Sequence, residues 1–345
     1  MKKNQWIKIG FQLAAIVLAL LFTTLVLLMA GASPLQAYLN VILGIFSSTA
    51  DITNVLAAWV PLLLTTSGVL ITFAAGLWNI GIEGQVVLGA IFTTGALRLL
   101  QNSPLAGGWI ILIGFLAGLV GGALWGALAG VLKTFGGVNE IFGGLGLNFV
   151  ATAFALFLII GPWGRPGIAS TSGTLMFPNK LWLPTPTNVA LSPWALALGI
   201  LVAVLVYFLL RGTYFGLRLK AVGKNMRAAF LLGVPTWQYS MYAFLLCGAF
   251  AGLAGAVQVT AVYHRLIPGI SSGYGFLGLL VAMLINYQAL WAAPIALFYA
   301  ALNIGGIQLP IVMKMDSSLS GVLQGILVLF VLMVEGARQR LFEKQ

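Results

Sequence analysis

Long apolar runs dominate the chain, and polar residues interrupt them only briefly. Because roughly 20 apolar residues in a helix cross the hydrocarbon core of a bilayer, about ten runs qualify as membrane spans. They cover roughly 9–32, 54–75, 83–100, 108–132, 141–161, 192–210, 240–262, 274–290, 292–309 and 318–336. The pattern therefore predicts an all-α, polytopic membrane protein with one transmembrane domain over residues 1–345.

Two longer connections organise these spans. An outer loop at about 162–191 is rich in proline, and an inner loop at about 211–239 is basic. The outer loop separates a first half, about 1–161, from a second half, about 192–345, with five spans in each. Since an odd number of spans per half makes the halves enter the membrane from opposite sides, we expect two inverted halves.

The third and eighth spans are counterparts in this scheme, and each follows a glycine-rich stretch. The first stretch reads "GLWNIGIEG" and the second "GISSGYGFLG". Glycine interrupts helices readily, so we expect discontinuous helices near the centre of the membrane.

Composition and charge narrow the class of protein. Charged residues make up 7% of the chain and hydrophobic residues 61%, whereas a soluble domain has roughly 25% charged residues. With both termini in the cytoplasm, twelve of the 17 Lys and Arg residues fall on the inner side, as the positive-inside rule requires. The basic residues are spread among short loops, which does not favour nucleic-acid binding. The single Cys cannot form an internal disulfide, and the single His does not suit a His-based metal site.

The stretch "AAGLWNIGIEGQVVLG" holds the most unusual polar group, Glu83, with Asn79 and Gln85 close by. A carboxylate at membrane depth is costly and faces protein or a wet cavity. A break in the helix would expose backbone groups that lipid cannot satisfy. Two roles for Glu83 stay open: it caps and braces a broken helix, or it gates or lines a path. Asn148, inside "GGVNEIFGGLGLNFV", is a second path-facing candidate.

Glycines recur at every fourth position of the fourth span, at Gly114, Gly118, Gly122, Gly126 and Gly130. They form one smooth stripe on a helix, which favours close packing of another helix. The alternative is a stripe that lines the substrate path.

The inner loop, "RGTYFGLRLKAVGKNMRAAFLLGVPTW", contains a predicted short helix at 226–232. Asn225 is a suitable N-cap and Gly233 a suitable C′ residue. Met226, Ala229 and Phe230 share one face by their spacing. This face would either dock into a groove of another protein or rest on lipid headgroups.

Three motifs carry a resemblance to a known family. They are "LWNIGIEGQ" at 77–85, "VNEIFGGLGLNF" at 138–149 and "GLRLKAVGKNMRAAFLLGV" at 216–234, and "GVLQGILVLFVL" at 321–332 fits more loosely. The chain resembles ABC importer permease subunits of the branched-chain amino acid, ribose and nucleoside permease family. It is most similar to the nucleoside or simple-sugar permeases that a BMP-type lipoprotein supplies.

The resemblance implies a membrane-spanning subunit of an ATP-driven importer, in a bacterial cytoplasmic membrane, that moves a neutral polar solute by alternating access. Nucleosides are the expected substrate, with ribose, another simple sugar or branched-chain amino acids as alternatives. The chain has no Walker-type phosphate loop, so it is not expected to be an enzyme. ATP and Mg²⁺ would bind to a partner ATPase, and this chain would bind no cofactor. The other expected partners are a second permease subunit, identical or related, an extracytoplasmic substrate-binding lipoprotein and membrane lipids.

The residues themselves predict a path or gate, and the resemblance adds a docking site. The expected translocation path or gate comprises Asn79, Glu83, Gln85, Asn148, Tyr274, Phe276 and Asn286. The expected ATPase-docking residues are Gly216, Arg218, Ala221, Gly223, Asn225, Arg227, Ala228, Ala229, Phe230 and Gly233. No catalytic or metal-ligating residue is expected.

One stretch departs from the family pattern. Leu277 stands where these permeases usually have an acidic residue after Gly-Tyr-Gly-Phe, and the Asn-Pro that normally follows is missing. Asn286 and Gln288 are the polar residues nearby. The rival from another class is a stand-alone secondary transporter, which would need ion-coupling carboxylates at mid-membrane. Beyond Glu83 the spans offer little of this kind.

Overall fold

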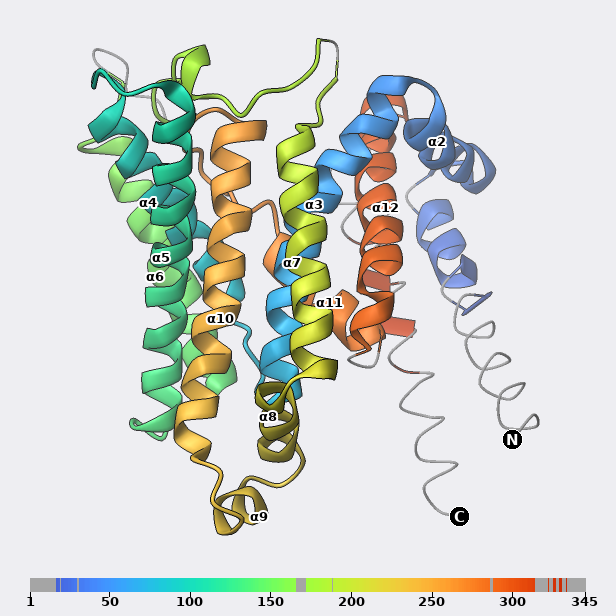
Figure 1. Ribbon diagram of the computed structural model, residues 1–345. Coiled ribbons are helices and arrows are strands. Elements are labelled where there is room, and N and C mark those ends of the chain that lie inside the picture. Colours follow the sequence, from blue (N-terminus) through green and yellow to red (C-terminus); the bar gives the residue numbers. More distant parts are fainter. Residues whose placement is uncertain are drawn as a thin grey trace. The chain divides into compact units, whose positions relative to one another are not determined.

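The computed structural model describes residues 17–18, 20–29, 31–165, 172–187, 189–285 and 288–313, with 322, 325, 326, 329, 330 and 333. The described part is helical and contains no strand (Figure 1). After a helical stretch at Leu20–Met29, the α-helices are α2 (Pro34–Phe46), α3 (Thr49–Ala74), α4 (Ile82–Leu100), α5 (Gly107–Thr134), α6 (Glu140–Ile160), α7 (Pro193–Gly212), α8 (Tyr214–Lys224), α9 (Met226–Leu231), α10 (Thr236–Val257), α11 (Tyr274–Leu284) and α12 (Ala292–Met313). A π-helical turn, Gln258–Val262, extends α10, and 3₁₀ turns lie at Asn179–Leu181 and Ala289–Trp291.

The predicted class is confirmed: this is a polytopic helical membrane protein. In the described ranges, six helices are long and apolar enough to cross a bilayer, namely α3, α5, α6, α7, α10 with its π-helical turn, and the Ala289–Ile307 stretch. Helix α11 ends earlier than the predicted span 274–290, at Leu284. Most of the predicted last span, 318–336, lies outside the described residues. Helices α2 and α8 were not predicted.

The chain forms two compact units. One holds α2 and the described residues from Phe298 onward, and the other runs from Leu56 to Leu297. In the first unit, Leu27 and Ala37 form a small buried cluster. The larger unit contains α4 to α11 and all the candidate site residues that the structure describes.

A glycine seam holds the centre of the larger unit together. Gly122 of α5 packs against Gly248 and Gly252 of α10, and α10 in turn meets α4 where Gly252 faces Gly89. A Cβ on any of these glycines would overlap backbone atoms of the facing helix. The stripe predicted on the fourth span is thus a packing surface, with backbone-to-backbone contact at Gly122 and Gly126 and contact to side chains at Gly114 and Gly130.

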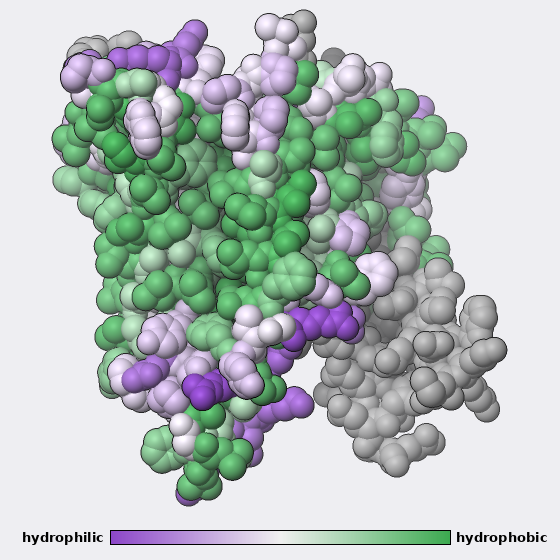
Figure 2. Space-filling view, in the orientation of Figure 1, coloured by the Kyte–Doolittle hydropathy of each residue, from purple (hydrophilic) through white to green (hydrophobic). Residues whose placement is uncertain are grey.

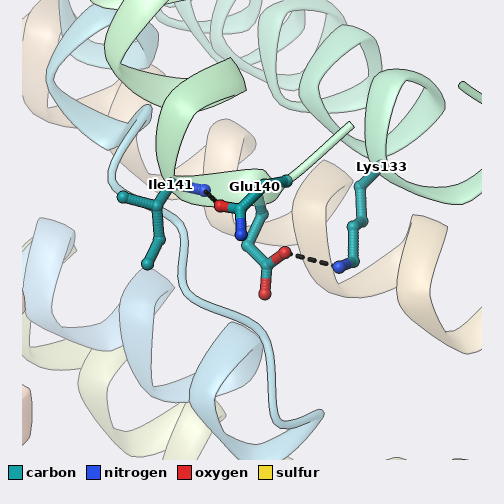
Figure 3. A network of polar contacts seen from close by, with 4 residues as sticks. Lys133, Glu140 and Ile141 are labelled. Atoms are coloured by element: carbon teal, nitrogen blue, oxygen red, sulfur yellow. Dashed lines mark hydrogen bonds and ion pairs between the residues drawn. The ribbon is translucent and has the colours of Figure 1, made fainter. Parts of the chain in front are cut away.

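A capped turn joins α5 to α6 (Figure 3). Asn139 is the N-cap of α6, and its side chain accepts a hydrogen bond of 2.9 Å from the backbone N–H of Ile141. Next to it, Glu140 pairs with Lys133 near the end of α5. This ion pair sits at the start of a helix, where a carboxylate is favoured in any case.

Different elements form the two ends of the larger unit, and an apolar band lies between them. Figure 1 shows α8 and α9 at one end and the segment 172–187 at the other. Between them, hydrophobic side chains cover the visible face, and polar residues gather towards the ends (Figure 2). This banding is the surface that a bilayer requires.

Candidate functional site

The break between α3 and α4 is a tightly built turn. Helix α3 ends in a Schellman motif, in which Leu77 N–H bonds to Thr72 O and Gly76 N–H to Phe73 O, both at 2.9 Å. Gly76 occupies the left-handed region with φ of +71°, where glycine carries no steric cost. The break predicted from the glycines is therefore present, and Gly76 is the residue that makes it.

Two amide side chains close this turn from inside. Asn79 and Gln85 exchange two hydrogen bonds, of 3.0 and 3.2 Å, and both residues are fully buried. The Asn79 amide also lies 3.0 Å from the Sγ atom of Cys247 on α10. A buried amide needs partners for both its donor and its acceptor. These residues thus fix the shape of the break and attach it to α10.

Asn148 supplies the cap that α4 lacks. The N-cap position of α4 is Gly81, which has no side chain. From α6, Asn148 accepts a hydrogen bond of 2.8 Å from Gly84 N–H and donates one of 2.9 Å to the Ile80 carbonyl. One side chain therefore satisfies a free donor and a free acceptor of the broken helix.

Glu83 joins the two broken helices. Its carboxyl group accepts hydrogen bonds from the backbone N–H groups of Gly273, Gly275 and Phe276, at 3.2, 2.9 and 3.3 Å. These groups open α11, whose own N-cap, Gly273, offers no side chain. Of the two roles that the sequence left open for Glu83, the structure shows the capping contact, and the helix that Glu83 caps is α11, 190 residues away in the chain.

The starts of α4 and α11 touch. A Cβ on Gly275 would lie 2.7 Å from the Cα atom of Glu83, so only glycine allows this approach. Thr65 of α3 adds a hydrogen bond of 2.9 Å from its hydroxyl to the Tyr274 carbonyl. Helices α3, α4 and α11 thus meet at one point, which we call the junction: Thr65, Glu83, Gly273, Gly275 and Phe276.

The remaining predicted path residues differ in position. Tyr274 is buried at the start of α11, whereas Phe276 is partly exposed. Asn286 lies outside the described residues.

Sequence reasoning missed Cys247 as a partner of Asn79, and it missed a polar group before α11 in which Ser272 lies within hydrogen-bonding distance of Gln258 and Tyr263.

The segment 172–187 pairs with the end of α10. Its backbone donates from Thr174 to Leu266, from Phe177 to His264 and from Leu183 to Thr260, each at 2.9 Å. Trp182 stacks on His264 with ring centroids 3.8 Å apart. Burial in this contact lowers the pKa of His264 below its ordinary value.

At the opposite end, α8 and α9 form a compact pair with well-defined caps. Thr213 caps α8 with a bond of 3.0 Å from Gly216 N–H, and Asn225 caps α9 with one of 2.9 Å from Ala228 N–H. Helix α9 ends at Leu231, and Gly233, with φ of +80°, follows its C-cap residue Leu232. The predicted cap, helix and C′ glycine are confirmed, and α8 is an additional helix.

The tip of α9 is unusually apolar for an exposed surface. Phe230, Leu231 and Leu232 are 65%, 79% and 83% exposed, and Met226 is exposed as well. Ala229, predicted to share the face of Met226 and Phe230, is instead buried. In Figure 2 the apolar tip projects beyond the polar band at this end of the molecule. We call Met226, Phe230, Leu231 and Leu232 the α9 tip.

Several of the other predicted docking residues point inward. Gly216 packs against Leu209 and Leu210 of α7, and Gly223 packs against Ala74 and Gly76. Arg218 reaches the Tyr239 hydroxyl at 3.4 Å. The exposed members of the predicted set, such as Arg227 and Phe230, therefore form its outer surface.

Comparison with known proteins gives a consistent result. A family model described as "Branched-chain amino acid transport system / permease component" matches residues 51–332. A glucose ABC transporter permease of Haloferax volcanii is 29% identical over 340 residues, or 96% of this chain and 88% of the relative. A guanosine ABC transporter permease of Bacillus subtilis is 28% identical, covering 92% and 91%. A nucleoside ABC transporter permease of Lactococcus lactis is 27% identical, covering 77% and 86%.

Proposed function

The chain belongs to the family of branched-chain amino acid transport permease components, and we propose that it is the membrane-spanning subunit of an ABC importer for nucleosides. The observation that carries the importer assignment is the apolar α9 tip, which lies beyond the membrane-like band. A protein partner would cover such a surface, because large exposed apolar patches mark interaction sites. The partner is an ATPase that binds ATP and Mg²⁺, while this subunit itself hydrolyses nothing.

The substrate assignment rests on the relatives' names. Two of the three relatives described above are permeases for guanosine or nucleosides. The glucose permease, which covers 96% of this chain, favours a simple sugar as the second candidate. Both are neutral polar solutes, in keeping with the few charged residues in the spans.

The topology that we propose has ten spans in two inverted halves, with both termini in the cytoplasm of a bacterial cell. Helices α4 and α11 support it, because both begin at a break and their starts meet at Glu83. In an inverted repeat these are the counterpart helices, and such breaks lie beside the substrate. A second permease subunit and an external binding lipoprotein complete the importer.

Within this scheme, the predicted path residues divide into two groups. Asn79, Gln85 and Asn148 hold the break before α4 in shape, and Glu83 links it to α11. Phe276 has the most exposed surface among the described members of the set and is the one that we expect to contact the solute. Aromatic faces stack on bases and on sugar rings alike.

A pull-down tests the function. The tagged chain, purified from its native membrane in mild detergent, should bring down an ATPase and a second permease in stoichiometric amounts. Phe230→Asp should abolish ATPase recovery, because it places a charge in an apolar contact. Tyr214→Asp is the matched control, since Tyr214 is an exposed aromatic at the far end of α8. Full ATPase recovery with Phe230→Asp would overturn the docking assignment, and recovery of this chain alone would favour a stand-alone transporter.

A further inference from the structure

Helix α8 touches the turn after α3 through bare backbone. A Cβ on Gly223 would overlap the Ala74 carbonyl oxygen and lie 2.8 Å from the backbone N of Gly76. In the other direction, a Cβ on Gly76 would lie 2.9 Å from the Gly223 carbonyl oxygen. No side chain separates the two segments, so no rotamer change can absorb a displacement of one against the other.

The same turn continues directly into the junction. Within nine residues after Gly76, Asn79 binds Cys247, Ile80 binds Asn148, and Glu83 binds the start of α11. The polar side chains of this segment are paired, and the segment is short. A displacement of α8 at Gly223 is therefore transmitted to the start of α11 with little loss.

The polypeptide connects the α9 tip to the membrane helices in two directions, through α8 and through α10. These two connections differ in stiffness. Towards α8, Asn225 closes both helices: its N–H donates to Ala221 O at 3.1 Å, and its side chain caps α9. Towards α10, the chain passes through Gly233 in the left-handed region and enters a helix that has no side-chain cap. The α8 route is the tighter connection.

We propose that the contact between Gly223 and Gly76 is the positioning joint that carries a displacement of α9 to the start of α11. This inference rests on the proposed function, because the displacement comes from an ATPase docked on the α9 tip. Glu83 is the last link, since it holds the first turn of α11 through three backbone N–H groups. Gly223 thus acts through position alone and contacts neither ATP nor solute.

Two insertions separate the routes. Two glycines between Lys224 and Asn225 loosen the α8 route, and the same two between Val234 and Pro235 loosen the α10 route. The complete importer is reconstituted in vesicles, and nucleoside uptake and ATP hydrolysis are measured together. The first insertion should lower uptake per ATP hydrolysed by about tenfold or more, and the second should change it by less than about twofold. If both insertions changed uptake per ATP hydrolysed equally, or if the second lowered it more than the first, the inference would be overturned.

A point variant tests the contact itself. Gly223→Ala should lower the same ratio, whereas Gly212→Ala should not, because a Cβ on Gly212 meets nothing within 4 Å. The thermal midpoints of both variants show how much of the effect comes from lost stability. If Gly223→Ala does not give folded protein, the comparison of the two insertion variants decides the question. A wild-type chain that binds no ATPase would overturn the proposed function and this inference together. An active wild type whose ratio survives the first insertion would overturn this inference alone.

Discussion

Replacing Glu83 by alanine removes a side chain that caps the start of α11. Three backbone N–H groups would then lose their acceptor, and only the one from Gly275, at 2.9 Å, is short. A buried donor left without a partner costs about 1–3 kcal/mol. Taking about 2 kcal/mol for the short bond and about 0.5 kcal/mol for each longer one gives about 3 kcal/mol.

Transport should respond more strongly than folding. About 3 kcal/mol corresponds to roughly 100-fold in an equilibrium between two conformations if only one of them keeps the contact. Spread over the unfolding of a chain of this size, the same free energy lowers the thermal midpoint by only a few degrees. Glu83→Ala should therefore reduce uptake by at least about tenfold while folded protein is still recovered in good yield.

The assay is uptake of radiolabelled nucleoside into vesicles that contain the complete importer, with the thermal midpoint measured in detergent. Glu140→Ala is the matched control, because Glu140 also starts a helix but pairs with a partly exposed lysine. Such pairs contribute about 0–1 kcal/mol, so uptake should stay near the wild-type rate. Glu83→Gln keeps one acceptor oxygen, so its uptake should fall between that of Glu83→Ala and that of Glu140→Ala. A well-folded Glu83→Ala protein with wild-type uptake would refute the reasoning.

Three further predictions concern stability. Asn148→Leu leaves a buried donor and a buried acceptor of the α4 turn unpaired and should lower the free energy of unfolding by about 2–4 kcal/mol, seen as a lower thermal midpoint; an unchanged midpoint would contradict the capping role. Gly122→Ala drives a Cβ into α10 and should cost at least about 1–3 kcal/mol, whereas Gly108→Ala, which meets nothing within 4 Å, should be neutral; equal midpoints would argue against the glycine seam. Burial in the folded protein lowers the pKa of His264, so its contribution to stability is complete above the unfolded pKa of about 6.5 and is lost as pH falls through the folded pKa. The midpoint should thus drop more between pH 7 and 5 in the wild type than in His264→Gln, and parallel curves would contradict this.

The sequence predicted the long helices well and the junctions between them poorly. Helices α5, α6 and α7 follow from uninterrupted apolar runs, and α9 follows from Asn225 and Gly233 because capping is local. Helix α8 was missed although Thr213 caps it, since its mixed composition has no continuous apolar run. The break before α4 was predicted from its glycines, but the helix that Glu83 caps was not, because no local pattern identifies a partner 190 residues away.

The glycine seam also has a consequence for biosynthesis. Gly122 of α5 leaves the ribosome about 130 residues ahead of Gly252 of α10, an interval of roughly 6–26 s at about 5–20 residues per second. During that time the smooth face of α5 faces lipid or a helper protein instead of its final neighbour. Chains halted before α10 emerges would thus leave the glycine stripe of α5 without the α10 backbone that covers it in the folded protein.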